Sequence, residues 1–366
     1  MRQALEGVGR ADGFPVPARA ANRNRRHDQN RSGGGGMARI VITGGAGFVG
    51  SHLARAAIEA GHDVHLIIRQ ASSDERLVPL EGRFSRHTLD LRSEWELHNC
   101  LGQLSPDYIY HLAACPRRLQ SSAFDDVREG ISDHLIGLTS LLAVAAHLPR
   151  PPKKLIRTGS LAEYGEAPAP YLETEREAPV NAYGAELTAA THLVRALQRR
   201  LPFPVITARL ALIYGDQQST DYLVPRLITR CLKGETTMVA HPEDRRDLLH
   251  VDDVVVPLMQ LMNAQTPGGT LVNIATGYAP TMRSVAEMIV RLTGCNPDLI
   301  TFGGSEQTSG IVDFRADTRM AKKLLSWSAT IGLDEGMERT VASYRDHLIP
   351  PEFVPVPDLA IMGRAQ

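Results

Sequence analysis

The sequence lacks an excess of either charge and any long apolar run. Its 366 residues carry 40 Lys and Arg against 41 Asp and Glu, a formal net charge of −1. Proteins that bind nucleic acid or anionic membranes usually carry a basic excess, so this balance argues against both kinds of partner. No apolar stretch reaches the roughly 18–20 residues that a membrane-spanning helix requires.

Cysteine is also scarce. Cys100, Cys115, Cys231 and Cys295 lie far apart in the sequence, and none belongs to a Cys-x-x-Cys pair. This spacing offers neither a zinc site nor a disulfide framework, so we predict no bound metal and a reducing, cytoplasmic location. The length suits one large domain with a smaller lobe.

Residues 1–36 differ in composition from the rest of the chain. They are rich in Arg, poor in aliphatic residues and end in four glycines. Such a segment cannot bury a core, so we predict a disordered leader and a folded protein that starts near Met37. A targeting peptide is the alternative, although the segment lacks the apolar stretch of a secretory signal.

From Met37 onward, short apolar strands alternate with longer helical stretches. This order predicts an α/β fold with a Rossmann-type doubly wound parallel sheet. The expected strands are 40–43, 62–68, 108–112, 155–158 and 204–210, and the expected helices are 51–60, 135–148 and 182–201.

After about Tyr214 the alternation loosens, and loops containing proline join shorter helices. We therefore expect a smaller C-terminal lobe. The predicted parts are a larger domain at 37–210 with returning segments at about 247–276, the smaller lobe at 211–246 and 277–345, and a tail at 346–366.

Three glycines, at positions 44, 47 and 50, directly follow the first expected strand. The first allows a tight turn, the second lets backbone amides approach a pyrophosphate, and the third lets the helix pack on the strand. The helix N-terminus adds partial positive charge. We predict that a dinucleotide is held by Gly44, Gly47, Phe48, Val49 and Gly50, which makes the larger domain a dinucleotide-binding domain. A plain glycine-rich turn is the alternative.

The segment 43–53, Thr-Gly-Gly-Ala-Gly-Phe-Val-Gly-Ser-His-Leu, resembles the signature of the extended short-chain dehydrogenase/reductases, the nucleotide-sugar epimerase/dehydratase family. The similarity continues to about residue 345. It implies a homodimer that forms through a helix pair. It also implies a nucleotide-sugar substrate, which makes the smaller C-terminal lobe the expected substrate-binding lobe. The further cofactor contacts that it implies are Asp90, Leu91, Leu112, Ala113 and Ala114.

The end of the second expected strand bears on the choice of cofactor. An NAD site usually has an acidic residue there, which binds the ribose 2′-hydroxyl. In this chain the position holds Ile68, and Arg69 follows. A guanidinium suits a 2′-phosphate, so we predict NADP(H) in preference to NAD(H). The alternative is that Arg69 is a solvated surface residue and the site takes either cofactor.

The resemblance also implies a catalytic Ser, a Tyr and a Lys four residues after the Tyr. Ser160 follows the fifth strand, and Tyr183 begins the long helix, where it also lies beside the cofactor. The structural alternatives are that Ser160 caps the end of the strand and that Tyr183 is a buried aromatic residue at the start of the helix. In the family's 4,6-dehydratases an acidic pair follows the Ser, whereas this chain has Leu161 and Ala162. Dehydration is therefore disfavoured.

Leu187 stands where the resemblance implies the Lys. That Lys lowers the pKa of the Tyr, so without it we expect the pKa of Tyr183 to stay near its reference of about 10. A neutral Tyr can already donate the proton that carbonyl reduction needs, whereas an epimerase must also oxidise and needs the phenolate. The departure favours a reductase, or a protein with weakened chemistry.

Two positions concern the substrate. Arg246, in the segment Arg-Asp-Leu-Leu-His-Val, resembles the family's arginine that binds the substrate pyrophosphate. An ion pair with Asp244 or Asp247 is the alternative. Leu212 replaces an Asn that usually approaches the sugar-nucleotide. We expect His250 to be structural, capping the return of the chain to the sheet, and a catalytic base is the alternative.

Together these features predict an NAD(P)-dependent nucleotide-sugar oxidoreductase that reduces an NDP-4-keto-(6-deoxy)hexose, with Tyr183 as proton donor and Ser160 orienting the sugar oxygen. A nucleotide-sugar 4-epimerase that retains its NAD(P) is one alternative. A catalytically weakened protein that binds nucleotide-sugars or dinucleotides is the other.

Overall fold

A computed structural model describes residues 36–114, 123–303 and 311–348. The predicted leader, apart from Gly36, lies outside these residues, as does the tail from residue 349. The first three residues of the predicted tail continue the last helix, α10, which spans Leu333–Leu348. Within the described ranges, no helix combines the length and apolar character required to cross a membrane.

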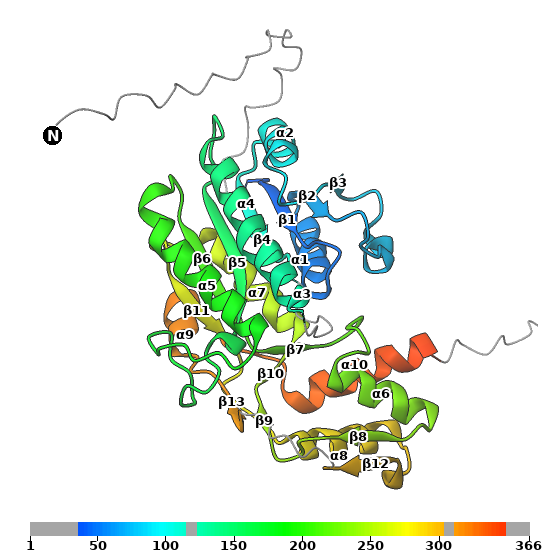
Figure 1. The fold of residues 1–366 in the computed structure, drawn as a ribbon. Helices are drawn as coiled ribbons and strands as arrows, with labels where there is room; N and C mark the ends of the chain where they lie inside the picture. Colours follow the sequence, from blue (N-terminus) through cyan, green and yellow to red (C-terminus); the bar gives the residue numbers. More distant parts are fainter. Residues whose placement is uncertain (1–35, 115–122, 304–310, 349–366) are drawn as a thin grey trace, which may run out of the picture. The chain divides into compact units, whose positions relative to one another are not determined.

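Seven parallel strands form the central sheet, in the order β11-β6-β5-β4-β1-β2-β3 (Figure 1). Strand order reverses between β1 and β4, so the crevice of the Rossmann fold opens at the carboxyl ends of these two strands. The strands are β1 (Arg39–Thr43), β2 (Asp63–Ile68), β3 (Ser85–Thr88), β4 (Tyr108–His111), β5 (Lys154–Ser160), β6 (Val205–Leu210) and β11 (Leu271–Ile274). The predicted fold class is confirmed.

The central strands are buried on both faces, which is why they read as nearly continuous apolar runs. Lys154 is a charged residue at the start of buried β5. Its ammonium donates to the carbonyl oxygens of Leu261 and Ala264, at 2.7 and 2.6 Å, where α7 ends. The cation therefore caps the C-terminus of α7 and donates two of its three hydrogens within the protein.

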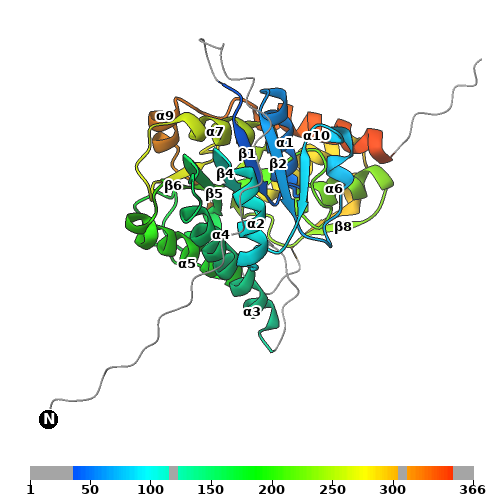
Figure 2. The ribbon, with the colours of Figure 1, turned by 90° about the horizontal axis from the view of Figure 1, so that it is seen from above.

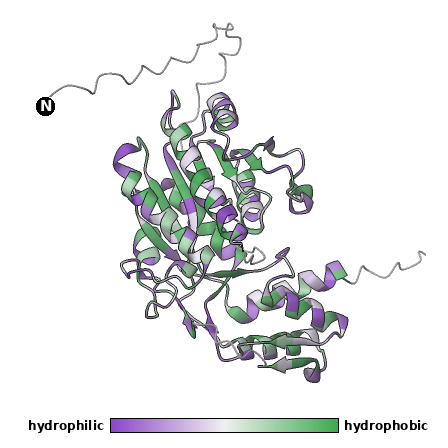
Figure 3. Cartoon of the chain, viewed as in Figure 1, coloured by the Kyte–Doolittle hydropathy of each residue, from purple (hydrophilic) through white to green (hydrophobic). Residues whose placement is uncertain are grey.

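Helices cover both faces of the sheet (Figure 2). One apolar core lies under α2, α4 and α5, and another lies under α1, α7 and α9. Hydrophobic and hydrophilic residues are mixed along these helices, as Figure 3 shows. The bounds are α1 (Phe48–Glu59), α2 (Glu94–Leu104), α3 (Asp125–Ile131), α4 (Gly137–Ala146), α5 (Ala182–Leu197), α7 (Val251–Asn263) and α9 (Arg319–Leu325).

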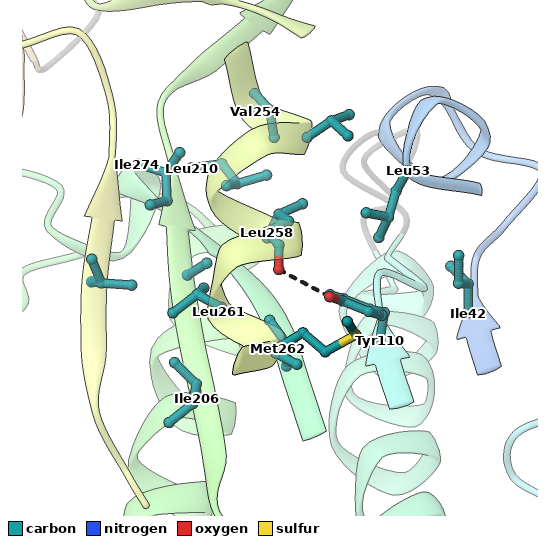
Figure 4. Close-up of a cluster of buried hydrophobic side chains, with 14 of the residues drawn as sticks. Ile42, Leu53, Tyr110, Ile206, Leu210, Val254, Leu258, Leu261, Met262 and Ile274 are labelled. Atoms are coloured by element: carbon teal, nitrogen blue, oxygen red, sulfur yellow. Dashed lines mark hydrogen bonds between the residues drawn. The ribbon is translucent and has the colours of Figure 1, made fainter. Parts of the chain in front are cut away.

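The core beneath α7 joins distant parts of the sequence (Figure 4). Leu258 and Leu261 of α7 belong to the same buried cluster as Ile206 of β6 and Leu53 of α1. The hydroxyl of Tyr110, on β4, donates to the carbonyl oxygen of Leu258 at 3.0 Å, so this buried polar group is satisfied.

Three predicted helices have different bounds in the structure. The first, α1, begins at Phe48 and not at 51, because Gly47 is its N-cap residue and the glycine loop is shorter than expected. The expected helix 135–148 is a π-helical turn, Ser132–Ile136, followed by α4. The expected helix 182–201 is α5 followed by the 3₁₀ turn Gln198–Arg200.

The C-terminal elements form a third core under α6 (Leu223–Lys233), α8 (Met282–Thr293) and α10. In Figure 1 these helices lie together, away from the sheet. Three short parallel pairs accompany them: β7 (Leu212–Tyr214) with β10 (Leu248–His250), β8 (Thr237–Val239) with β12 (Ile300–Phe302), and β9 (Arg245–Arg246) with β13 (Asp313–Phe314). The exact domain boundaries stay a prediction.

Candidate active site

The glycine loop leaves no room for side chains. At Gly44, where φ is +73°, a Cβ would lie 2.8 Å from the backbone of Leu112 and Ala113. At Gly50 it would lie 2.2 Å from the carbonyl oxygen of Gly44, while the Gly47 amide donates to that oxygen at 2.9 Å. The turn therefore brings bare backbone and the N-terminus of α1 to one place, which fits a cofactor pyrophosphate.

Two cavities meet at this loop. They measure about 150 Å³ and about 770 Å³, and each is lined by Gly44, Gly47, Leu112 and Ala114. All the remaining predicted site residues line one cavity or the other. Arg69, Asp90, Leu91 and Ala113 line the smaller, whereas Phe48, Val49, Gly50, Ser160, Tyr183 and Arg246 line the larger.

The smaller cavity holds alternating charges. Arg69 donates to Asp133 at 3.2 Å, so it is an exposed residue with an ionic partner. Asp90 accepts hydrogen bonds from Arg92, which lower the pKa of the Asp90 carboxyl. Ile68, at the end of β2, is buried and offers no acceptor to a ribose.

Ser160 both caps a helical turn and lines the larger cavity. It is the N-cap residue of the 3₁₀ turn Leu161–Glu163, and its Oγ accepts the Ala162 amide hydrogen at 3.1 Å. Capping occupies an acceptor site of the hydroxyl, so its own hydrogen is available to a ligand in the cavity. The structural and the catalytic interpretations are therefore compatible.

Glu163 supports Ser160 from beneath. This fully buried carboxylate accepts the Ser160 amide hydrogen at 3.1 Å and the Thr191 hydroxyl at 2.7 Å. Arg209, also fully buried, donates to Glu163 from Nε at 2.9 Å and to Glu177. The two carboxylates thus flank one guanidinium and hold the end of β5 in place.

Tyr183 lies in the first turn of α5, against a buried pair of polar residues. Its ring meets the ring of His134 edge to face, with centroids 5.8 Å apart. His134 in turn contacts Glu186 at 2.7 Å. Burial is the main reason that the pKa of Tyr183 is raised, and the charge of Arg157 opposes the shift. The expectation of a pKa near 10 is therefore wrong, and the phenol is more firmly protonated.

The site has no ammonium at position 187, because the residue there is Leu. The side chain of Leu187 is buried, with 3% of its surface exposed. The charge of Arg157 opposes the rise in the pKa of Tyr183, as the charge of the missing Lys would; Arg157 is fully buried in β5 and donates to Thr191 at 2.8 Å. Because Arg157 is held among buried hydroxyls, it influences the phenol only through space.

Arg246 makes the ion pair that was the alternative to a substrate contact. Its Nη2 lies 2.5 Å from Oδ2 of Asp244, and its Nη1 donates to the Ile311 carbonyl oxygen at 2.9 Å. Arg246 nevertheless lines the larger cavity. Leu212 also lines that cavity and is 38% exposed. His250 ends β10 and is the N-cap residue of α7, because its Nδ1 accepts the Asp252 amide hydrogen, so it caps a helix and not a return to the sheet.

Sequence reasoning missed several polar residues. Arg76, Arg226 and His241 line the larger cavity, and they come from three separate segments. Nothing in their spacing indicates that they meet. For Arg157 and Arg209 a signal existed, because a charged residue inside an apolar strand needs a buried partner. In the part of the chain that the structure describes, no cluster of three His, Cys, Asp or Glu could hold a metal ion.

A family model described as the NAD dependent epimerase/dehydratase family matches residues 40–275. The chain belongs to this family. The dTDP-glucose 4,6-dehydratase of Neisseria gonorrhoeae is 27% identical over 339 residues, which cover 85% of this chain and 97% of that enzyme. The UDP-glucuronic acid decarboxylase 1 of Xenopus tropicalis is 26% identical over 87% of this chain and 76% of its own length.

Two similar solved structures agree with this assignment. The UDP-glucose 4-epimerase of Thermotoga maritima, solved with UDP-glucose, has a TM-score of 0.76 and 26% identity, covering 84% of this chain and 99% of its own. MoeE5, solved with UDP-glucuronic acid and NAD, has a TM-score of 0.75 and 28% identity over 84% of this chain and 99% of its own. The predicted family resemblance is confirmed.

Proposed function

We propose that the protein is a nucleotide-sugar reductase that converts the 4-keto group of an NDP-4-keto-(6-deoxy)hexose to a hydroxyl. The observation that carries the proposal is the position of Ser160 and Tyr183 on one large cavity that also reaches the glycine loop. A cavity of about 770 Å³ is within the usual range for a small-molecule site.

The bound cofactor would supply a hydride from C4 of its reduced nicotinamide. Tyr183 gives its proton to the sugar oxygen as the carbonyl carbon is reduced, so the carbonyl gains one hydride and one proton. Ser160 donates its hydroxyl hydrogen to the same oxygen and so orients the carbonyl. The raised pKa of Tyr183 keeps it protonated at neutral pH, the state that reduction requires.

Named relatives carry out other reactions, among them dehydration and 4-epimerisation. A dehydratase is disfavoured, because Leu161 is buried and apolar and Ala162 is a methyl group where the family's dehydratases have acidic residues. A 4-epimerase that retains NAD(P) is the second candidate, since a similar solved structure is a UDP-glucose 4-epimerase. An epimerase needs the phenolate of Tyr183 in its oxidative step, and burial opposes this ionisation.

For the cofactor we propose NADP(H) in preference to NAD(H), because Ile68 and Arg69 stand where NAD-binding members have an acid. Gly44, Gly47 and Gly50 would bring backbone amides to the pyrophosphate, with Asp90 and Leu91 at the adenine. The expected homodimer and cytoplasmic location stay proposals drawn from the family resemblance and the composition.

The deciding experiment offers NDP-4-keto-6-deoxyhexoses to the purified protein with NADPH and follows absorbance at 340 nm. Turnover with exchangeable NADPH supports the reductase. Tightly retained nicotinamide, together with interconversion of 4-epimers without added cofactor, would establish the epimerase instead. Binding of nucleotide-sugar and cofactor without turnover of any substrate would identify a protein that has lost its chemistry.

A further inference from the structure

A carboxylate reaches the end of β2 from another part of the chain. Asp133 belongs to the π-helical turn Ser132–Ile136, and its Oδ2 lies 3.2 Å from Nη1 of Arg69. The side chain of Asp133 is 17% exposed and that of Arg69 is 57% exposed. The tertiary structure thus brings an acid to the cavity that Ile68 and Arg69 also line.

A second ion pair lies at the same cavity, beside Arg69 and Asp133. Arg92 pairs with Asp90 and also donates to the Ser132 hydroxyl at 3.4 Å. Arg69, Asp90, Arg92 and Asp133 all line the smaller cavity. Two positive and two negative side chains therefore face the adenosine end of the proposed cofactor site, and their formal charges cancel.

We propose that Asp133 is a cofactor-specificity residue that acts against Arg69. A carboxylate accepts hydrogen bonds from ribose hydroxyls, which a guanidinium cannot do. It also repels a 2′-phosphate, which carries a charge of about −1.5 to −2 at neutral pH. Arg69 favours NADP(H), Asp133 favours NAD(H), and the ion pair between them keeps the preference of the natural protein small.

This inference rests on the cofactor site of the proposed function and not on the direction of the reaction. Its test therefore uses binding. We would titrate the full chain calorimetrically with 5′-AMP and with 2′,5′-ADP, two probes that differ by the 2′-phosphate, and repeat the titration with NADH and NADPH by fluorescence.

Asp133→Asn should raise the affinity for 2′,5′-ADP relative to 5′-AMP by about tenfold, as expected when one like charge leaves a partly exposed corner. Asp133→Ser is a second variant without the charge and should shift the ratio in the same direction. Arg69→Ala should shift it the opposite way. Glu129→Gln is the control, because Glu129 is an exposed acid on α3 that does not line the cavity.

An unchanged ratio in both Asp133 variants, or an equal shift in Glu129→Gln, would overturn the inference while leaving the proposed function intact. If neither probe binds the natural protein, the inference and the proposed function both fail. If the Asp133 variants shift the ratio but no 4-keto sugar is reduced, only the reductase proposal fails.

Discussion

The imidazole Nδ1 of His134 lies 2.7 Å from Oε2 of Glu186, and both side chains are almost fully buried. The pair joins the π-helical turn to α5 directly beside Tyr183. Glu186 immediately precedes Leu187, the position at which the family resemblance implies a Lys. A buried carboxylate–imidazole contact therefore holds the His134 ring against Tyr183, the proposed proton donor.

Glu186→Gln should lower the free energy of unfolding by about 1.5–3 kcal/mol, because it removes a charge-assisted hydrogen bond and leaves the buried imidazole with a weaker partner. Urea denaturation measures this loss. The exposed Glu129→Gln on α3 is the control and should change stability by less than about 0.5 kcal/mol. Equal effects of the two substitutions would show that the pair does not stabilise the fold.

Gly130→Ala tests the same contact from the other side. A Cβ on Gly130 would lie 2.0 Å from Oε1 of Glu186, so the carboxylate must move and we expect a loss of about 1–3 kcal/mol. Gly102→Ala in α2 meets nothing within 4 Å and should instead stabilise the protein by about 0.4–1 kcal/mol. A neutral result at Gly130 would contradict the close packing described here.

Tyr183→Phe should lower kcat for ketone reduction by at least about 10²-fold, the usual contribution of general acid catalysis, with cofactor affinity unchanged. The substitution removes the hydroxyl and keeps the ring against His134. Steady-state kinetics with NADPH titration checks both statements. Parental activity in Tyr183→Phe would exclude Tyr183 as the proton donor.

The reverse reaction should depend steeply on pH. Burial holds the pKa of Tyr183 above its usual value, so the phenolate fraction rises about tenfold per pH unit throughout the range below that pKa. Oxidation of the alcohol product should follow this rise from pH 6 to pH 9, whereas the supply of protonated Tyr183 for reduction stays constant. A plateau of the oxidative rate below pH 8 would be inconsistent with the raised pKa.

Leu187→Lys should move that oxidative profile toward lower pH, because an ammonium one helical turn after Tyr183 favours the phenolate. The site is buried, so we also expect a loss of stability of several kcal/mol unless the new charge finds a partner. Leu187→Met is a control of similar volume without the charge. If both variants have the parental pH profile, position 187 does not act on Tyr183.

Arg246→Ala should raise KM for the nucleotide-sugar and leave NADPH affinity unchanged, because Arg246 lines the larger cavity and not the smaller. The loss of a charge-assisted contact corresponds to roughly a tenfold to hundredfold change. Arg245→Ala, on the neighbouring exposed residue, is the matched control. Weakened NADPH binding in Arg246→Ala would mean that this arginine serves the other ligand.

His111 should make the fold sensitive to mild acid. Burial, and then the charges of Arg157 and His134, lower the pKa of His111 to about 3 in the folded state, against 6.5 when exposed. The unfolded chain takes up a proton below pH 6.5 and the folded protein does not, so stability falls as the pH drops from 6.5 toward 3.

Between pH 7 and pH 5, protonation of His111 in the unfolded chain should by itself lower the free energy of unfolding by about 2 kcal/mol. His111→Asn should remove that share of the acid sensitivity, as measured by urea denaturation at the two pH values. His98→Asn, at an exposed position on α2, should leave the difference unchanged. Acid sensitivity equal to that of the parent in His111→Asn would contradict the lowered pKa.

The sheet and the glycine loop could be predicted because their signals are local. Apolar runs mark the buried parallel strands, and the spacing of Gly44, Gly47 and Gly50 follows from contacts within a single turn. The start of α1 was harder to predict from the sequence, because a glycine such as Gly50 usually indicates a loop, yet Gly50 lies inside the helix. In that position a glycine serves close packing against the Gly44 carbonyl and not backbone freedom.

The charged contacts of the site depended on tertiary structure. Asp133 reaches Arg69 across 64 residues, His134 reaches Glu186 across 52, and Arg209 reaches Glu163 across 46. The sequence by itself determined the fold class, the position of the dinucleotide loop and the absence of Lys at Leu187, because these reside in short segments. Only the tertiary structure decided which charge neutralises Arg69 and how firmly Tyr183 holds its proton, because burial and partners exist only once distant segments have packed together.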